Sequence, residues 1–463
     1  MRRPRVVAVA GVIVVLAFSP LGPSALAAGP RVIAPTPFVT SERPFLVALE
    51  AGVIVQPVLT TGDIIGEGAG AYQMSGVPDG IGWYGSADGV VEVFFNHELH
   101  PDYDPSGSRV SHVTMNTSGE VTAAEYLVDG TEGYEWFCSS TLEIIDGDPW
   151  YLTGEESKHS PRKGMAIAID ASTGAVHETP WFGHFGHENV VPVEGLSGAF
   201  LGLSEDGFSE YSQYFAYLAN SFDGALAGDE GSLRVWVPDE EVADGNPSDN
   251  DLDKGETMRG HLERIPHAED LLPLKLEKLV QSMGAFDFNR IEDQIDDPND
   301  PGMIYFAETG RANQEVTHGR VYRLEVDPSS PRKATLSVVL DAAAGDDIFS
   351  PDNLGISDAA LLIQEDRNWK QSGFNRVLVY DLLTGTLSPV ARTDPDQAII
   401  DDRGPGAWES SGIVDVSEVF GPGWWLLNVQ AHYTEVGVPD QSLEPDTATG
   451  EGGQLALVFI PGT

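Results

Sequence analysis

Cysteine and basic residues are both scarce in this 463-residue chain. It has one cysteine, Cys138, which excludes an intrachain disulfide framework. Lysine and arginine together number 26 against 72 aspartates and glutamates, so the formal net charge is −46. DNA, RNA and anionic membranes repel such a chain, and no basic patch suited to nucleic-acid binding is found in the sequence. We therefore expect small-molecule partners and no nucleic-acid role.

Long apolar runs are also missing after the first thirty residues. The chain opens with the basic segment MRRPR, an apolar run that Pro20 interrupts, and Ala25-Leu26-Ala27. This order is typical of a signal peptide, so we predict that residues 1–27 are cleaved and that residues 28–463 form one monomeric domain, secreted or periplasmic, without stable membrane insertion. An uncleaved anchor is the alternative, although the apolar stretch is shorter than a bilayer span. Arg2-Arg3 leaves both the general and the twin-arginine export routes open.

Short strands dominate the mature sequence. Segments such as 90–99, 232–239 and 454–461 are rich in β-branched and aromatic residues and are bounded by Gly, Pro, Asp or Asn. One segment, 267–283, has the apolar spacing of a helix, with Pro273 in its first turns. The sequence therefore predicts an all-β fold with few short helices. At this length and without a linker, that fold is a set of stacked sandwiches, a β-helix or a propeller.

Acidic residues recur at or beside the ends of these strands. In a propeller, equivalent strand ends of different blades converge on the axis, whereas a sandwich would scatter them, so the recurrence favours a propeller. Carboxylates gathered at close range repel one another, which implies bound cations. The residues are Glu98, Glu155, Glu156, Glu188, Glu205, Asp206, Glu292, Asp293, Asp352, Glu365 and Asp366.

Two further features bear on metals. Cys138 is either a small buried apolar side chain or a thiolate ligand that would shift a carboxylate site toward a transition metal. The acidic segment 238–256 contains Asp249, Asp251 and Asp253, which resemble the start of a calcium loop, but Lys254 occupies the position that needs glycine. We interpret this segment as a solvated insertion loop, with calcium binding as the alternative.

Arg290 and Glu292 are two residues apart, so in a strand both side chains face the same side. An arginine beside a metal carboxylate suits an anionic substrate such as a phosphate, which it can grip through two hydrogen bonds. Asp352 and Asn353 offer a further carboxylate and amide. The alternatives are an ordinary ion pair and a Pro-Asp turn.

The order of these motifs resembles that of PhoX-type alkaline phosphatases over roughly residues 67–430. The strings that carry the resemblance lie at 96–98, 138, 150–156, 183–188, 203–206, 288–292, 350–353, 364–366 and 427–430. It implies a six-bladed β-propeller of a secreted phosphatase, which hydrolyses phosphate monoesters of small molecules at a central cluster of Fe³⁺ and Ca²⁺. By the same resemblance, Cys138 is an iron ligand, and Arg290 with Asn353 holds the phosphate. The remaining implied metal ligands are Glu155, Glu188, Glu292 and Asp352, with Glu98 and Glu205 as further ones.

The chain also departs from the family pattern. The segment after Cys138 is Ser139-Ser140 where the family is glycine-rich, Ile291 stands where the family has proline, and Ala431 separates Gln430 from the final histidine. Two other functions therefore stay open: a non-catalytic, calcium-stabilised binding propeller, and a calcium-dependent phosphotriesterase or lactonase. We leave His97, His187 and His432 out of the catalytic set, because single histidines in strands are usually hydrogen-bonded structural residues.

Overall fold

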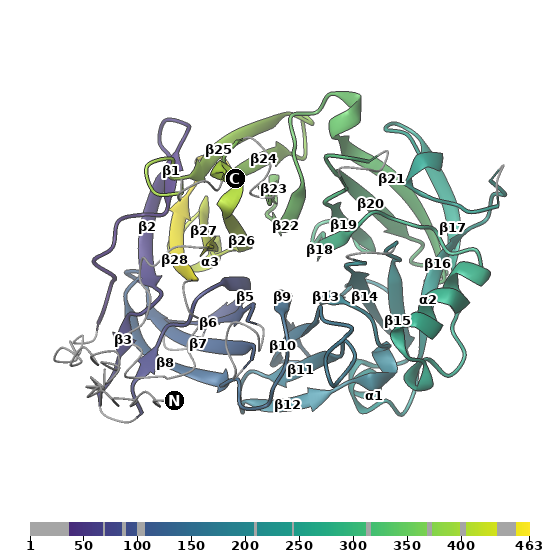
Figure 1. Cartoon of the computed structure of the whole chain (residues 1–463), viewed down its shortest axis with the longest axis horizontal. Helices are drawn as coiled ribbons and strands as arrows, with labels where there is room; N and C mark the ends of the chain where they lie inside the picture. Colours follow the sequence, from purple (N-terminus) through teal and green to yellow (C-terminus); the bar gives the residue numbers. More distant parts are fainter. Residues whose placement is uncertain are drawn as a thin grey trace, which may run out of the picture. The chain divides into compact units, whose positions relative to one another are not determined.

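Antiparallel strands make up most of the regular structure in the computed structural model (Figure 1). It describes residues 37–67, 70–85, 89–99, 107–207, 211–242, 245–311, 316–367, 373–398, 404–432 and 451–463. The α-helices within these ranges are α1 (Phe222–Ala227), α2 (Pro273–Ser282) and α3 (Ser417–Phe420). The prediction of an all-β chain with few short helices is confirmed. The predicted signal peptide, residues 1–27, lies outside the described residues.

Four sheets are consecutive antiparallel meanders, two of which gain a strand from the N-terminal region. The first contains β5 (Pro78–Gly85), β6 (Val90–His97), β7 (Arg109–Asn116) and β8 (Val121–Val128). The second contains β9 (Phe137–Ile145), β10 (Asp148–Glu155), β11 (Ala166–Asp170) and β12 (Ala175–Glu178). The third contains β22 (Pro351–Ile356), β23 (Ala360–Glu365), β24 (Arg376–Asp381), β25 (Leu387–Thr393) and the added β1 (Leu46–Ala48). The fourth contains β26 (Trp408–Asp415), β27 (Trp424–Ala431), β28 (Gly452–Phe459) and the added β2 (Ile54–Thr60).

The largest sheet joins two such meanders. Its first half contains β13 (His187–Pro192), β14 (Ala199–Glu205), β15 (Phe215–Ala219), β16 (Ser232–Pro238) and β17 (Thr257–Arg264). Its second half contains β18 (Ile291–Asp296), β19 (Met303–Glu308), β20 (Arg320–Val326) and β21 (Lys333–Asp341). Pairing of β17 with β21 connects the halves. A separate small hairpin consists of β3 (Ile64–Ile65) and β4 (Tyr72–Gln73).

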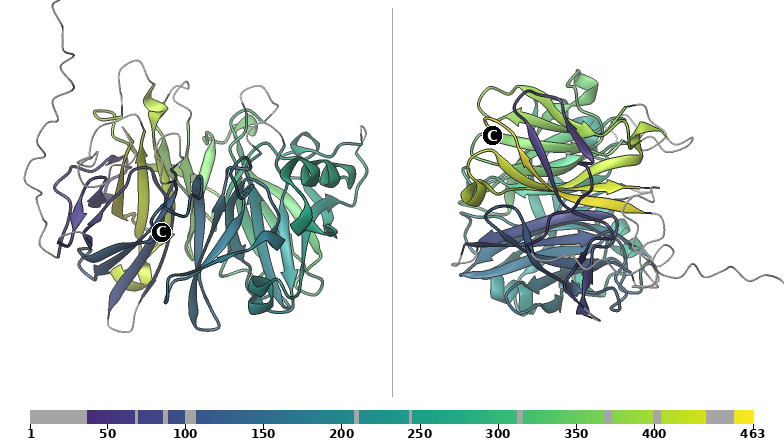
Figure 2. Two further views of the ribbon diagram at one scale, coloured as in Figure 1. Left: turned by 60° about the horizontal axis from the view of Figure 1, so that its bottom comes forward. Right: turned by 90° about the vertical axis from the view of Figure 1, so that its left-hand side faces the viewer.

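The sheets surround a common centre, as in a propeller (Figure 1). The innermost strands are β5, β9, β13, β18, β22 and β26, and each contacts the next around the ring, with β26 returning to β5. In side view the strands run between two opposite faces of the ring (Figure 2). Apolar side chains between neighbouring sheets form the cores, such as Trp408 and Trp425 between the last two sheets. Strands inside these sheets pack against a neighbouring sheet on each face, which is why β19 (MIYFAE) is apolar or aromatic up to its last residue, Glu308.

The N-terminal strand β2 closes the ring by pairing with β28, from Ile54 opposite Phe459 to Thr60 opposite Gln454. A chain that starts at residue 62 would expose the edge of β28 and remove Leu59, which is fully buried. We expect that chain to aggregate or to melt more than ~10 °C below a chain that starts at residue 37. Circular dichroism of the two purified chains tests this, and equal melting temperatures would contradict the closing role of β2.

The predicted helix and insertion loop are refined by the structure. A short 3₁₀ turn occupies Ala268–Asp270, and the α-helix begins only at Pro273, whose missing N–H costs nothing at that position. In the loop between β16 and β17, Asp249 is buried while Asp251 and Asp253 are exposed. The three carboxylates therefore do not share one side of a calcium loop. None of the described helices is long and apolar enough to cross a membrane.

Candidate metal centre

The register of the inner strands repeats around the ring. In each of six described hairpins, the first residue of the inner strand pairs with the last residue of the strand that follows. The pairs are Pro78–His97, Phe137–Glu155, His187–Glu205, Ile291–Glu308, Pro351–Glu365 and Trp408–Ala431. The ladder shifts register within a few residues of this end in every hairpin. Such β-bulges re-aim the side chains beside them.

The residue after each member of these pairs belongs to the same end of the ring. On the inner strands these residues are Asp79, Cys138, Glu188, Glu292, Asp352 and Glu409. After the second strands they are Glu98, Glu156, Asp206, Thr309, Asp366 and His432. All except Thr309 carry a carboxylate, a thiol or an imidazole. Equivalent positions of the repeat therefore bring together groups that are up to about 350 residues apart in sequence.

A repeated backbone contact fixes these positions. The N–H of Glu98 donates to the carbonyl of Val77 at 2.9 Å, and the N–H of Glu156 to the carbonyl of Trp136 at 2.9 Å. The same contact joins Asp206 to Gly186, Thr309 to Arg290 and Asp366 to Ser350. Four residues directly before inner strands, Val77, Trp136, Arg290 and Ser350, have left-handed φ values of 49°, 50°, 69° and 49°. Strain of this kind persists where the surrounding structure holds the residue in place, and it is common at functional sites.

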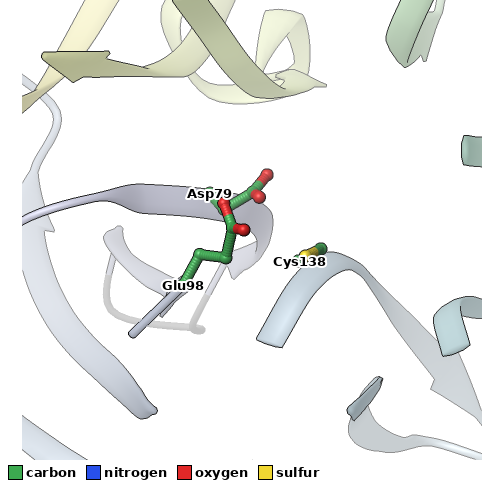
Figure 3. Close-up of side chains that lie close together, drawn as sticks. All are labelled: Asp79, Glu98 and Cys138. Atoms are coloured by element: carbon green, nitrogen blue, oxygen red, sulfur yellow. The ribbon is translucent and has the colours of Figure 1, made fainter. Parts of the chain in front are cut away.

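Ten of the twelve side chains at these positions, all except Asp206 and Thr309, line a cavity of about 270 Å³. Among the described residues, eight carboxylates contribute to its wall, and Cys138, Arg290 and His432 complete the ionisable lining. The carboxylates are Asp79, Glu98, Glu156, Glu188, Glu292, Asp352, Asp366 and Glu409. Figure 3 shows Asp79 and Glu98 of one sheet beside Cys138 of the next. The cavity therefore combines hard oxygen donors with one soft sulfur donor.

Four groups of three possible ligand atoms run around this cavity, each with its atoms within 4.8 Å of one another. The thiol of Cys138 belongs to two of them, and its Sγ donates to Glu156 Oε2 at 3.0 Å. The groups are Asp79, Glu98 and Cys138; Cys138, Glu156 and Glu188; Glu188, Asp206 and Glu292; and Asp352, Asp366 and Glu409. Each is compact enough to surround one cation.

The electrostatics of these side chains are unfavourable without bound cations. Burial raises the pKa of the Cys138 thiol well above its usual value, and the charge of Glu156 raises it further. Burial likewise raises the pKa of Glu156 and Glu188, with added repulsion from Asp206 and Glu292 respectively. These shifts arise because the side chains lie close together with little compensating charge. Bound cations would remove the repulsion and stabilise the ionised forms.

Arg290 is the principal compensating charge. Its Nε and Nη2 donate to Asp206 Oδ2 at 3.1 and 2.8 Å, and its Nη2 lies 3.0 Å from Glu292 Oε1. Burial lowers the pKa of Arg290, but these carboxylates raise it by more, so the guanidinium stays charged. The side chain is 26% exposed and lines the cavity. Two carboxylates therefore orient a permanent positive charge at the cavity wall.

His432 lies between two carboxylates. Its Nε2 is 3.3 Å from Glu409 Oε1, and its Nδ1 is 2.9 Å from Glu451 Oε2. Burial lowers the pKa of His432, but Glu409 and Glu451 raise it by more, to well above its usual value. His432 is not among the predicted catalytic residues, but it lies in the cavity wall.

Most of the residues predicted as functional meet at the cavity, but three lie elsewhere. Cys138, Glu98, Glu188, Glu292, Asp352 and Arg290 line it. Glu155 instead accepts hydrogen bonds from Ser160 Oγ and the N–H of Glu135, and Glu205 accepts one from the N–H of Gln213. Neighbouring side chains of an extended chain point to opposite sides. The following residues, Glu156 and Asp206, therefore take the positions predicted for Glu155 and Glu205.

Asn353, the predicted partner of Arg290, is 2% exposed and does not line the cavity. Its Nδ2 donates to Ser139 Oγ at 3.2 Å, and its Oδ1 lies 3.1 Å from Ser411 Oγ. Ser139 in turn donates to Glu188, and Ser411 donates to Asp79. Asn353 is therefore linked through Ser139 to Glu188 and through Ser411 to Asp79, two carboxylates of the cavity wall.

Asp79 and Glu409 are not among the residues predicted from the sequence. Asp79 lies in a Pro-Asp-Gly segment that is typical of a turn, and Glu409 is a single acid between Trp408 and Ser410. Their only sequence signal is their position, directly after the first residue of an inner strand, as at Glu188, Glu292 and Asp352.

No protein-family model matches the chain, and no curated protein matches it in sequence. Among solved structures, PhoX from Pseudomonas fluorescens, in complex with vanadate as a transition-state analogue, aligns with a TM-score of 0.58. The alignment has 15% identity and covers 90% of this chain and 96% of that one. The chain shares the propeller fold of PhoX. An α-L-arabinanase from Penicillium chrysogenum aligns with a TM-score of 0.39 and 10% identity over 82% of this chain and 93% of its own.

Proposed function

We propose that this chain is a metal-dependent phosphatase that hydrolyses phosphate monoesters of small molecules. The observation that carries the proposal is the cavity in which Arg290 faces carboxylates and a thiol suited to bind several cations. The shared fold with PhoX, whose structure holds vanadate, supports it, since vanadate is an oxyanion chemically similar to phosphate. We further propose that the protein acts outside the cytoplasm as a monomer.

We propose that the propeller has six blades. The largest sheet contributes two of them, because β13–β16 and β18–β21 are each four-stranded meanders with their own inner strand. In this interpretation β17 is an additional outer strand that bridges two blades through β21. The six repeats of the inner hairpin register support this count.

The donor set fits a mixed iron and calcium centre. Cys138 with Glu156 and Glu188 offers a thiolate and carboxylates, which suit Fe³⁺, and the all-carboxylate groups at Glu292 and Asp352 suit Ca²⁺. Burial and the neighbouring carboxylates raise the pKa of the Cys138 thiol, and a bound cation would favour its ionised form. When bound, the cations supply positive charge that neutralises phosphate oxygens as the ester bond breaks.

Arg290 lies beside the one position of the ring, Thr309, that has no ionisable side chain. In the fourth blade the position after the second strand is Thr309, whose N–H donates to the carbonyl of Arg290 at 3.0 Å. A guanidinium thus replaces an acid at this part of the wall. We assign Arg290 to bind and orient two oxygens of the phosphate, while Asp206 and Glu292 hold its plane in place. A cation here favours an anionic monoester over the neutral triesters and lactones of the alternative hypothesis.

Metal content is the first experiment. After exhaustive dialysis, elemental analysis of the purified protein is expected to find iron together with an excess of calcium. Kinetics on an aryl phosphate monoester, a neutral phosphotriester and a lactone then separate the candidate activities. Calcium without iron and without ester turnover would support a binding propeller, and turnover of only neutral esters or lactones would contradict the phosphatase.

Removing the metals is expected to destabilise the fold. With the cations gone, the carboxylates of the cavity repel one another, and the stabilisation by ligand binding is lost. We expect a chelator to lower the melting temperature by about 5 °C or more. Re-addition of calcium and iron should restore it. A melting temperature that does not change after verified removal of metal would contradict a bound cluster.

A further inference from the structure

Three arginines converge at the end of the blades that faces away from the cavity. Arg234 of β16 and Arg264 of β17 are direct cross-strand partners. Arg332 comes from the connection between β20 and β21, and its carbonyl accepts the N–H of Leu262 at 2.7 Å. All three line one pocket of about 370 Å³. We name it the arginine pocket.

The arginine pocket is separate from the central cavity. Strand β14 runs from Ala199, which lines the pocket, to Glu205, the neighbour of Asp206 in the acidic ring. Its seven residues span about 20 Å. The pocket wall also includes Phe200, Asn220 and Ser232, and none of its residues belongs to the cavity lining.

The arginines repel one another within the described structure. Like charges directly opposite each other on paired strands are destabilising. Burial lowers the pKa of Arg234, and the charges of Arg332 and Arg264 lower it further, by more than Glu263 raises it. Arg234 Nη1 donates to the Leu262 carbonyl at 3.0 Å, whereas its buried Nε has no partner. Among the described residues, no carboxylate forms an ion pair with any of the three.

This concentration of unpaired positive charge is unusual in a chain of net charge −46, where acids could neutralise it. We propose that the arginine pocket binds a doubly charged oxyanion, a phosphate or sulfate group, at a site distinct from the central cavity. Guanidinium groups match tetrahedral oxyanions through paired hydrogen bonds. An anion with two negative charges would offset part of the repulsion among the three arginines.

The size and surroundings of the pocket restrict the ligand further. The pocket is larger than one tetrahedral oxyanion, so the group can be a substituent of a larger molecule. A nucleic-acid backbone would need several phosphate contacts along a basic stripe, and the strongly acidic chain disfavours that. The arginine pocket therefore recognises a single anionic group.

The test uses the full protein and a double variant, Arg264→Gln with Arg332→Gln. Equilibrium dialysis with radiolabelled inorganic phosphate, and separately with sulfate, at low ionic strength gives the number of bound anions. We expect the variant to bind one anion fewer per chain, or to bind it at least ~10-fold more weakly. Arg259→Gln is the matched control, because Arg259 is exposed on the same strand but lies on the opposite face from Arg264. Unchanged stoichiometry and affinity in the double variant would overturn the proposal.

Thermal unfolding separates binding from a structural role. In anion-free buffer the double variant should melt at the same temperature as the wild type or higher, because repulsion is relieved. The wild type, but not the variant, should gain stability on addition of the anion that binds. Loss in the phosphate arm alone identifies a phosphate group, and loss in both arms identifies a general oxyanion pocket. A variant that melts well below the wild type without anion would show that the arginines are structural and would overturn the proposal.

Discussion

Cys138→Ser is expected to remove bound iron and to lower kcat/KM for a phosphate monoester by about 10²-fold or more, since even indirect contacts to a metal ligand are often worth 10–100-fold. The thiol belongs to two of the ligand groups. One also contains Asp79 and Glu98, and the other contains Glu156 and Glu188. A serine hydroxyl keeps the size of the side chain but binds iron poorly. Iron content and kinetics measured on the same preparation test the link between metal and activity.

Ser140→Ala is the matched control for this substitution. Ser140 lies two residues further along β9 and does not line the cavity. We expect this variant to keep its iron and its activity. Circular dichroism of both variants shows whether the fold is retained. A Cys138→Ser protein that stays iron-loaded and active would remove Cys138 from the metal centre.

The positions of the strands along the chain could be predicted from the sequence because they depend on local patterns. Apolar β segments bounded by turn residues mark the strands, and acids at their ends mark the end of the ring where the blades converge. The start of α2 could also be anticipated, because proline is tolerated only in the first turn of a helix. These features need no knowledge of long-range contacts.

The orientation of individual side chains could not be predicted in the same way. In a strand, a shift of one residue changes which face a side chain occupies, and bulges beside the cavity cause such shifts. The pairs Glu155-Glu156 and Glu205-Asp206 therefore give no sequence signal for which member enters the cavity. The arginine pocket is harder still to predict from the sequence, because Arg234, Arg264 and Arg332 come from three separate segments of the chain.

Arg290→Gln is expected to lower kcat/KM for phosphate monoesters by about 10²–10³-fold, the loss typical when one preorganised donor to a developing charge is removed. Glutamine keeps a hydrogen-bonding group but removes the positive charge that interrupts the acidic ring. Arg290→Lys should recover only part of the activity, because an ammonium group keeps the charge without the planar pair of donors. Inhibition by vanadate should weaken in parallel with kcat/KM, since both depend on holding an oxyanion.

The metal content of the Arg290→Gln variant distinguishes the role of Arg290 from that of Cys138. Arg290 contacts Asp206 and Glu292. Neither of these carboxylates belongs to the two ligand groups that contain Cys138. Iron is therefore expected to stay bound in Arg290→Gln while activity is lost. Arg162→Gln is the matched control, because Arg162 is 25% exposed and pairs with Glu178 at 2.8 Å, away from the cavity lining. Full activity and full vanadate sensitivity in Arg290→Gln would show that the phosphate is held by other groups, and the anion-binding role of Arg290 would then be wrong.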